Sequence, residues 1–221
     1  MRNSDETETN DLSSLSRPLG GWHKRGFDIV VATSALLILL PLFGVLSLII
    51  VLTDGAPIFY GQKRRGYGGA HFTCWKFRTM VRDADMALDT YLASDREAAV
   101  EWSQSRKLKS DPRVTAIGSF LRKTSLDELP QLWNVLVGEM SVVGPRPVVD
   151  GEIGYYGGAF KHYAAARPGI TGAWQVSGRS DTSYPSRVRL DSEYVTQWSL
   201  GRDIVILSRT IPAVLSQRGS Y

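Results

Sequence analysis

The sequence has one cysteine and three histidines among 221 residues, and both scarcities exclude classes of protein. A single cysteine, Cys74, allows no disulfide within the chain, which is typical of proteins from a reducing compartment. The histidines are scattered, so the sequence offers no cysteine–histidine cluster with the spacing of a zinc site. The fold is therefore expected to rest on apolar residues, which make up 43% of the sequence.

Acidic residues are concentrated at the N-terminus. Residues 1–16 hold one arginine against four acids, so they carry −3 of a formal net charge of +4, and the rest carries +7. A basic body of this kind suits nucleic acid, an anionic membrane surface or a phosphorylated substrate. Residues 1–21 are polar and are predicted to form a disordered tail.

Charge is absent altogether from Ile29–Thr53. A straight helix needs about 20 apolar residues to cross a bilayer, so this run is long enough. Basic residues flank it on both sides, with Lys24 and Arg25 before it and Lys63–Arg65 after it. Because such residues favour the cytoplasmic side, both ends of the run are expected to stay there.

Pro41 divides this apolar run. Proline removes a helix hydrogen bond and kinks the axis, and two arms of about 12 residues would each reach about 18 Å, one leaflet deep. The sequence therefore predicts a re-entrant membrane helical hairpin over residues 22–54. A kinked helix that crosses the membrane is the alternative. The residues assigned to the hairpin are Lys24, Arg25, Asp28 and Pro41.

Two adjacent carboxylates, Asp127 and Glu128, stand where a helix is expected to begin. Apolar residues recur at helical spacing over Leu129–Leu136, and Pro130 fits only the first turn. Ser125 with Glu128 matches a capping box, whereas Asp127 as the N-cap is the other choice. Either choice places both carboxylates beside the positive end of a helix dipole, which keeps them ionised.

Fixed cations surround this acidic pair in the sequence. Carboxylates among arginines suit a divalent metal that faces phosphates, because the acids hold the metal and the arginines hold phosphate oxygens. Asp127 and Glu128 are therefore candidate Mg²⁺ ligands, and an N-capped helix with surface ion pairs is the alternative. Four side chains are expected to bind diphosphate or lipid phosphate: Lys76, Arg78, Arg122 and Arg146. At least one of them is expected to form a structural ion pair instead.

The remaining segments have weaker patterns. Pro57–Tyr60 and Phe72–Phe77 favour strands, and Gly66–Gly69 between them predicts a β-hairpin. The predicted helices are Val81–Lys107 (one or two), Ala116–Lys123, Ser186–Trp198 and Arg202–Leu215. Glycine and proline predict loops at Gly138–Gly158 and Arg167–Arg179. The apolar stripe of the last helix is expected to face the core, or else the membrane, and consists of Ile204, Leu207, Ile211 and Leu215.

The motifs of residues 22–221 resemble those of the bacterial sugar transferases, the small monotopic phosphoglycosyl transferases. The C-terminal segment looks closest to the galactose-1-phosphate transferases of succinoglycan-type exopolysaccharide synthesis. Besides the residues of the predicted hairpin, the resemblance is carried by Gln62-x-Arg64-x-Gly66, Lys76–Met80, Asp111–Thr115, Ser125–Leu132, Gly138–Pro147 and Arg167–Gly172.

The resemblance implies a reaction in which a UDP-sugar and undecaprenyl phosphate give undecaprenyl-diphospho-sugar and UMP. It implies that Asp127 is the nucleophile, that Glu128 supports it and that Mg²⁺ is required. It further implies a location at the cytoplasmic face of the bacterial inner membrane. No nucleic-acid partner is expected, and the choice between UDP-galactose and UDP-glucose and a homo-oligomeric state are left open.

The residues themselves agree with phosphoryl transfer between two anions, which depends on charge neutralisation and positioning. Trp174, Gln175 and Arg179 offer an aromatic face beside amide and guanidinium donors and are a candidate uridine region. A different class of function is a membrane-anchored basic module that binds anionic lipid or nucleic acid without catalysis. That alternative does not explain an acidic pair at the centre of a basic field.

The predicted fold class is α+β, mainly helical. The expected organisation is a disordered tail at residues 1–21, a re-entrant membrane helix at 22–54 and a compact cytoplasmic catalytic domain with a small β-hairpin at 55–221.

Overall fold

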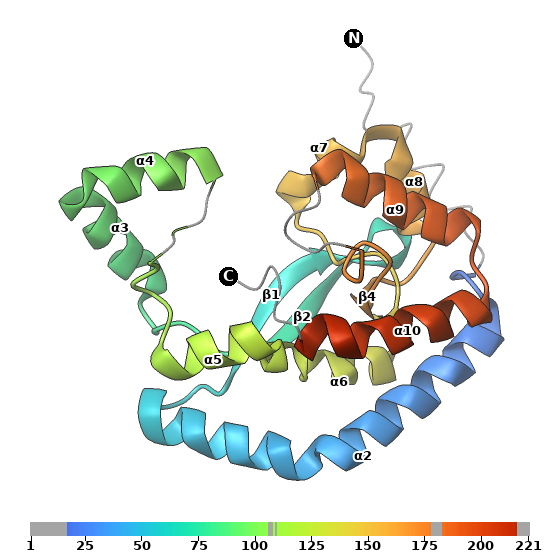
Figure 1. Ribbon diagram of the computed structural model, residues 1–221, viewed down its shortest axis with the longest axis horizontal. Helices are drawn as coiled ribbons and strands as arrows, with labels where there is room; N and C mark the ends of the chain where they lie inside the picture. Colours follow the sequence, from blue (N-terminus) through green and yellow to red (C-terminus); the bar gives the residue numbers. More distant parts are fainter. Residues whose placement is uncertain (1–16, 106–107, 109, 178–182, 216–221) are drawn as a thin grey trace.

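The computed structural model describes residues 17–105, 108, 110–177 and 183–215. One long helix, α2 (Gly21–Asp54), runs along one side of the molecule, and the other elements lie on its inner side (Figure 1). These elements are mostly helices, with two small two-stranded sheets among the described residues. The mainly helical α+β prediction is confirmed.

Helix α2 is a single helix of 34 residues with Pro41 inside it. Figure 1 shows it bent near its middle, as expected where a proline removes a backbone hydrogen bond. Ala32 in the first half packs into the main core, and Leu46 and Ile50 in the second half pack on Phe77. Both halves therefore contact the same globular body, while the arrangement in a membrane stays a prediction.

The predicted β-hairpin is confirmed. Strand β1 (Phe59–Arg65) pairs antiparallel with β2 (His71–Phe77), and the register runs from Phe59 opposite Phe77 to Arg65 opposite His71. The short helical turn η1 (Tyr67–Gly69) joins them. Gly68 and Gly69 have φ values of 63° and 73°, which only glycine adopts without strain.

The predicted helices also form, with shifted ends. They are α3 (Ala84–Ser94), α4 (Arg96–Ser105), α5 (Ala116–Thr124), α9 (Tyr184–Thr196) and α10 (Leu200–Leu215). Thr115 is the N-cap of α5, and its hydroxyl accepts a hydrogen bond from the Gly118 backbone N–H at 3.0 Å. Figure 1 shows α3 and α4 as an arm that projects away from the rest of the fold.

The prediction of plain loops at 138–158 and 167–179 is wrong in part. Strand β3 (Ser141–Val143) pairs in parallel with β4 (Gly169–Thr171). A Cβ on Gly169 would lie 2.1 Å from the Gly144 backbone nitrogen, so this glycine allows a close backbone approach. The short helices of this region are η3 (Asp150–Glu152), α7 (Ile153–Tyr156), η4 (Gly157–Ala159) and α8 (Phe160–Ala164).

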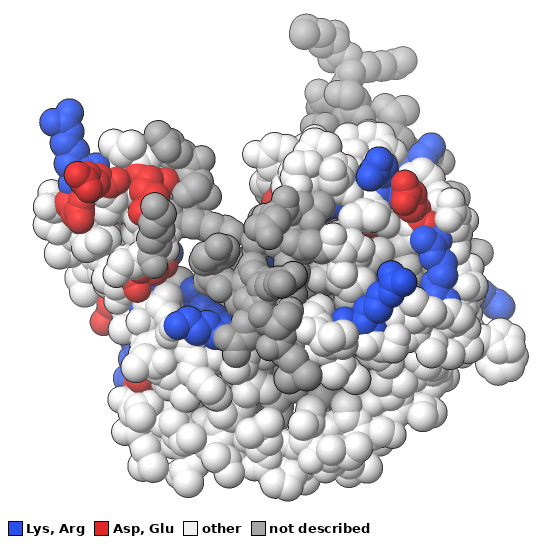
Figure 2. All heavy atoms as spheres, in the orientation of Figure 1, with Lys and Arg blue, Asp and Glu red and all other residues white. Residues whose placement is uncertain are grey.

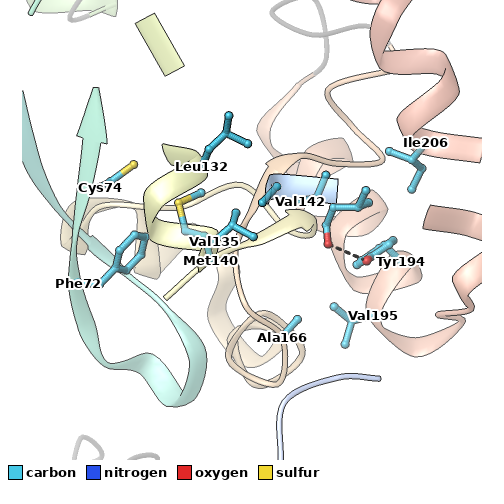
Figure 3. Close-up of a cluster of buried hydrophobic side chains, with 12 residues drawn as sticks. Phe72, Cys74, Leu132, Val135, Met140, Val142, Ala166, Tyr194, Val195 and Ile206 are labelled. Carbon is cyan, nitrogen blue, oxygen red and sulfur yellow. Dashed lines mark hydrogen bonds between the residues drawn. The ribbon is translucent and has the colours of Figure 1, made fainter. Parts of the chain in front are cut away.

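The main core surrounds α6 (Gln131–Val137). Val135 and Met140 are fully buried, and they lie among side chains of β2, β3, α9 and α10 (Figure 3). Apolar burial on this scale is the main stabilising term in folding. Because the acidic pair Asp127–Glu128 directly precedes α6, the core fixes the position of that pair.

The apolar stripe predicted for α10 divides between two environments. Leu207 packs against the core, whereas Ile204 and Ile211 are 55% and 65% exposed. The buried face is instead formed by Asp203 and Ile206. The expectation of a wholly core-facing stripe is therefore wrong, because a buried carboxylate shifts the inward face by one residue.

An apolar face covers the outer side of α2. Among the described residues, α2 is the one helix long and apolar enough to cross a membrane, and 11% of its most apolar window is buried. Figure 2 shows no charged side chain along the lower side of the molecule, where α2 lies. Its most exposed aliphatic side chains are Val30, Leu37, Ile38, Leu40, Leu48 and Leu52.

Candidate active site

The acidic pair lies in a tight helical turn, η2 (Leu126–Glu128), between α5 and α6. Ser125 precedes it with a φ of 56° and makes no capping hydrogen bond through its side chain, so the predicted capping box is wrong. Pro130 is the N-cap of α6 rather than part of its first turn, and Asp127 does not cap that helix. Neither carboxylate is therefore used to cap α6.

Lys76 of β2 joins the two carboxylates. Its Nζ lies 2.6 Å from Glu128 Oε1 and 3.5 Å from Asp127 Oδ2. The Asp127 side chain is 11% exposed and that of Glu128 is 31% exposed. Asp127 is therefore the more enclosed of the two, and a single ammonium group neutralises part of the charge of both.

The two carboxyl groups have opposite pKa shifts. Burial raises the pKa of Asp127, and the neighbouring Glu128 charge adds to the rise although Lys76 opposes it. Burial alone would also raise the pKa of Glu128, but the Lys76 ammonium outweighs it and leaves that pKa below its ordinary value. Burial, rather than the start of a helix, therefore dominates at Asp127, while Glu128 holds the negative charge of the ion pair.

Two predicted phosphate-binding arginines act on the pair through their charge. The Arg122 guanidinium lowers the pKa of Asp127, and its Nε donates to Thr79 Oγ1 at 2.9 Å. The Arg146 guanidinium lowers the pKa of Glu128. Lys76, Arg122 and Arg146 thus form one electrostatic group with the acids.

Arg78 lies apart from this group, at the end of α2. It is buried, and its Nη2 donates to the backbone oxygens of Asp54 and Gly55 at 2.8 and 2.5 Å. Its Nε and Nη1 make no hydrogen bond within the described part of the chain. Arg78 therefore holds the junction between α2 and β1, and phosphate binding by its other nitrogens stays a prediction.

The candidate uridine region is divided. Trp174 is buried, and the Arg146 guanidinium lies 5.5 Å from its ring centroid. Gln175 donates through Nε2 to the Ile170 backbone oxygen at 3.0 Å, so its amide supports β4. Arg179 lies outside the described residues. Of the three residues, the structure places Trp174 beside a cation of the site.

Asn134, a fully buried polar residue of α6, was not predicted as part of the site. Its Nδ2 donates to the Thr73 backbone oxygen at 2.7 Å, and its Oδ1 accepts from the Trp75 backbone N–H at 3.1 Å. These bonds tie α6 to the strand that carries Lys76. The signal was an amide residue within an otherwise apolar run, where an unpaired polar group would be costly.

Arg64, a residue of the Gln62-x-Arg64-x-Gly66 motif, also contributes to the site although it was not predicted to. Its guanidinium lowers the pKa of Glu128, and it donates to the Pro147 backbone oxygen at 3.1 Å and to Gln62 Oε1 at 2.6 Å. The first of these bonds links β1 to the loop that carries Arg146. Arg64 therefore adds positive charge and fixes a neighbouring cation.

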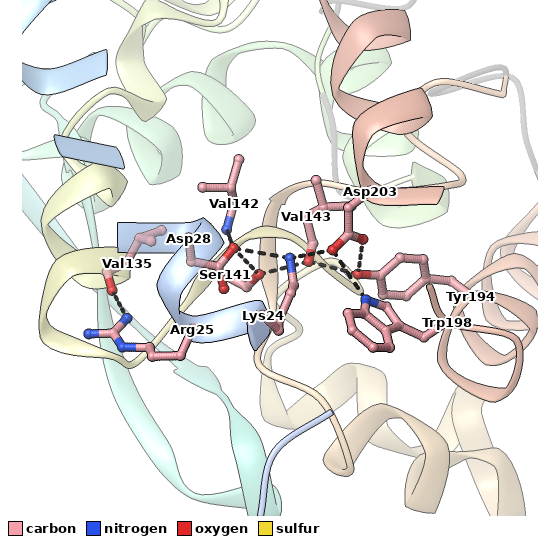
Figure 4. Close-up of polar contacts among 10 residues, drawn as sticks. All are labelled: Lys24, Arg25, Asp28, Val135, Ser141, Val142, Val143, Tyr194, Trp198 and Asp203. Carbon is pink, nitrogen blue, oxygen red and sulfur yellow. Dashed lines mark hydrogen bonds and ion pairs between the residues drawn. The ribbon is translucent and has the colours of Figure 1, made fainter. Parts of the chain in front are cut away.

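Lys24 and Asp28, predicted as membrane-hairpin residues, are buried inside the protein (Figure 4). Lys24 Nζ lies 3.0 Å from Asp28 Oδ1 and 2.8 Å from Asp203 Oδ2. The Ser141 hydroxyl donates to Asp28, and the Trp198 indole N–H donates to Asp203. The Lys24 charge is thus neutralised within the fold, so it cannot act as an exposed basic flank.

Arg25 is used in a similar way. It donates to the backbone oxygens of Val135 and Leu136 at the end of α6, at 2.5 and 2.7 Å. Arg167 donates to the Gly138 backbone oxygen at 2.6 Å. Cations at a helix C-terminus satisfy carbonyl groups that have no partner within the helix. Helix α2 is therefore bonded to the helix that follows the acidic pair.

The acidic pair fits a Mg²⁺ site whose coordination shell is completed by substrate phosphates. Among the described residues, no cluster of three or more His, Cys, Asp or Glu side chains could hold a metal by itself. Mg²⁺ is often bound through one or two carboxylates, with phosphate oxygens and water filling the remaining positions. Asp127 and Glu128 offer that donor set, although Lys76 already engages one oxygen of Glu128.

Comparisons with known proteins show three relatives that each match most of this chain. The chain is 52% identical over 205 residues to the exopolysaccharide production protein ExoY of Sinorhizobium fredii, covering 93% of this chain and 91% of that protein. It is 48% identical over 209 residues to the undecaprenyl-phosphate galactose phosphotransferase of Salmonella typhimurium, covering 95% of this chain and 44% of that one. It is 38% identical over 223 residues to the undecaprenyl-phosphate glucose phosphotransferase of Komagataeibacter xylinus, covering 93% and 38%.

A family comparison extends over nearly the whole described chain. The family described as bacterial sugar transferase matches residues 19–217, which include α2, the acidic pair and every cation discussed above. The resemblance predicted from the motifs is thereby confirmed, and the interpretation as a non-catalytic basic module is set aside. The chain belongs to the bacterial sugar transferase family.

Proposed function

We propose that this protein transfers a sugar-1-phosphate from a UDP-sugar to undecaprenyl phosphate and releases UMP, as the first membrane step of exopolysaccharide synthesis. The carrying observation is the enclosed Asp127 beside Glu128 and Lys76, with the charges of Arg122 and Arg146 around it. Relatives named for exopolysaccharide production and for galactose or glucose phosphotransfer to undecaprenyl phosphate support the substrate classes.

The reaction proceeds in two displacements at one phosphorus. An Asp127 carboxylate oxygen bonds to the sugar-bearing phosphorus, and the bond to UMP breaks with its electron pair leaving on the UMP oxygen. An oxygen of the lipid phosphate then bonds to the same phosphorus, and the bond to Asp127 breaks, which regenerates the carboxylate. The raised pKa of Asp127 makes its ionised form a more basic nucleophile.

The surrounding cations supply charge neutralisation, which is the main demand of phosphoryl transfer. Lys76 holds Glu128 in its ionised form, and Arg122 and Arg146, whose charges act on the acidic pair, would contact phosphate oxygens. When bound, Mg²⁺ would neutralise diphosphate oxygens from the side of Asp127 and Glu128. The cations and the metal together would draw two anionic substrates to one site.

We further propose that α2 enters the bilayer from the cytoplasmic face and returns to it. Both halves of α2 pack on the same globular body, and both ends are bonded to it, through Lys24 at one end and Arg78 at the other. A helix that crossed the bilayer would draw one of these buried polar contacts across hydrocarbon. The outer side of its middle region is apolar and exposed, as a membrane-embedded surface requires (Figure 2).

The covalent intermediate gives the sharpest test of the reaction. Purified enzyme incubated with UDP-sugar, without lipid acceptor, is expected to gain one hexose phosphate on the peptide that holds Asp127. Asp127→Asn should abolish turnover and the adduct while the protein stays folded, because burial already favours an uncharged group there. Full turnover by Asp127→Asn, or an intact mass of wild type that never shifts, would exclude this mechanism.

Glu128→Gln provides the matched control within the same turn. It removes the charge that Lys76 contacts at 2.6 Å but leaves the nucleophile in place. We expect slow but measurable turnover that rises with added Mg²⁺. An adduct on the Glu128 variant that still maps to Asp127 separates the two roles, whereas an adduct on Glu128 in wild type would reverse them.

Topology is tested by labelling single cysteines in intact cells. Cys74 is buried and burial raises its pKa to about 11, so its thiol reacts slowly. Cys74→Ser removes this thiol and leaves only the introduced cysteine to be labelled. Cysteines introduced at Asn10 and at Asp95 are both expected to resist a membrane-impermeant reagent until the cells are opened. Labelling of one position alone from outside would mean that α2 crosses the membrane.

A further inference from the structure

A small pocket adjoins Arg146, the arginine whose charge lowers the pKa of Glu128. It is lined by Arg146 and Trp174 together with Tyr156 of α7 and Asp191 of α9, and its remaining walls are Val148, Glu152, Tyr184 and Arg187. The free space inside it is about 10 Å³, which is close to the room that one water molecule needs. Arg146 thus belongs both to this pocket and to the group of charges around the acidic pair.

Two buried polar atoms on the pocket-lining residues have no hydrogen bond. They are the indole Nε1 of Trp174 and the Oδ1 of Asp191, on side chains that belong to residues 4% and 2% exposed. The other carboxylate oxygen, Oδ2, accepts from the Tyr156 hydroxyl at 2.9 Å. Buried polar groups in folded proteins are nearly always paired, so two unpaired groups of opposite type in one pocket indicate a missing partner.

The missing partner can be specified by chemistry. An indole N–H only donates, and an oxygen of the ionised Asp191 carboxylate, the form present above its raised pKa of about 7, only accepts, so the partner must accept from one and donate to the other. Its size is limited to about that of a water molecule. A hydroxyl group meets all three conditions, whereas a phosphate oxygen cannot donate and an ammonium group cannot accept.

Arg146 relates the pocket to the donor substrate. Its guanidinium lies 5.5 Å from the Trp174 ring centroid and also lowers the pKa of Glu128. A diphosphate oxygen bound by Arg146 would therefore bring the groups attached to that phosphate to the mouth of the pocket. The hexose is attached directly to the phosphorus that Asp127 attacks, whereas the ribose lies beyond the second phosphate.

We propose that this pocket receives one hydroxyl group of the donor hexose, which accepts from Trp174 Nε1 and donates to Asp191 Oδ1. The inference rests on the proposed function and adds two groups that recognise the sugar, Trp174 Nε1 and Asp191 Oδ1, which we call the reading groups. The Arg187 guanidinium, 4.6 Å from the Trp174 ring centroid, and Arg146 hold that ring in place. Asp191 is oriented by Tyr156, so both reading groups are positioned before the substrate binds.

The test measures kcat/KM of wild type with a panel of UDP-hexoses that each lack one hydroxyl group, and with donors that lack a ribose hydroxyl. For one deoxyhexose donor, kcat/KM is expected to be about 10- to 100-fold lower than for its parent, because the missing hydroxyl group leaves both pocket groups unpaired. A loss confined to a deoxyribose donor would overturn the assignment to the hexose. Equal kcat/KM across the panel would mean that the pocket holds only water.

Variants then show whether the loss passes through the two reading groups. In Trp174→Phe and in Asp191→Leu, which remove the donor and the acceptor respectively, the ratio between the parent and the sensitive deoxyhexose donor should fall to about 3-fold or less, whatever the absolute rate. Tyr155→Phe is the matched control, because Tyr155 is exposed and does not line the pocket, and it should keep the ratio. A ratio that persists in both reading variants would overturn the proposal.

These outcomes are distinct from failure of the proposed function. If no UDP-sugar gives UMP and a lipid-linked product with wild type, the reaction itself is wrong. If the reaction proceeds but the ratios do not change as stated, only the assignment of the pocket is wrong. Because the wild-type panel needs no variant, a variant that fails to fold does not remove the test.

Discussion

Replacing Lys24 with methionine would leave Asp28 and Asp203 buried without the cation that contacts both. The Lys24 side chain is 5% exposed and both carboxylates are 0% exposed. Removing one partner of a buried ion pair typically costs about 3–5 kcal/mol, because the charge that stays behind has lost its compensation. Neutral donors such as Ser141 and Trp198 still reach the carboxylates, which argues for the lower part of that range.

Urea unfolding in detergent micelles, followed by tryptophan fluorescence, would measure this loss for Lys24→Met. Lys63→Met is the matched control, because Lys63 is exposed on β1, and it should change the free energy of unfolding by less than about 0.5 kcal/mol. Adding Asp203→Asn to Lys24→Met should recover part of the loss, since it removes one uncompensated charge. A loss below about 1 kcal/mol for Lys24→Met would refute the reasoning.

Two further predictions follow from buried polar groups. Asn134→Leu should lower the free energy of unfolding by about 2–4 kcal/mol, because it leaves the Thr73 oxygen and the Trp75 N–H unpaired; denaturant unfolding would show it, and a neutral result would contradict the role of this amide in holding β2. Burial raises the pKa of Asp191 from 3.8 to about 7, so the folded state binds the extra proton. The free energy of unfolding should therefore fall as pH rises from about 4 to about 7, by up to about 1.4 kcal/mol per pH unit, and Asp191→Asn should flatten this dependence; equal slopes in wild type and variant would contradict the shift.

Local patterns predicted the elements whose signals are long or repeated. The apolar run of α2, the glycine turn of the hairpin and the helical spacing of α5 all matched the structure. They did so because propensity and burial favour the same conformation there. The parallel pair β3–β4 was missed, since three-residue strands carry no periodicity and the glycines that allow their close approach also indicate loops.

The site was predicted by residue type but not by contact. The pairing of Lys76 with Glu128 joins positions 52 residues apart, and sequence spacing carries no information on such distances. Lys24 was read as a flanking charge because its partner Asp203 lies on the last helix. Asp191 gave no signal at all, since one acid in a polar helix is ordinarily exposed.

The bonds from Arg25 to the last carbonyls of α6 fix the position of the acidic pair relative to α2. Helix α6 has seven residues, about 10 Å of axis, and the acidic pair lies just beyond its other end. In the proposed membrane arrangement, the depth at which α2 settles in the lipid thereby sets the level of the Asp127 carboxylate above it. Bilayer thickness and headgroup packing would then change turnover without any contact between lipid and carboxylate. They would do so by changing the depth of the Asp127 carboxylate relative to the lipid phosphate.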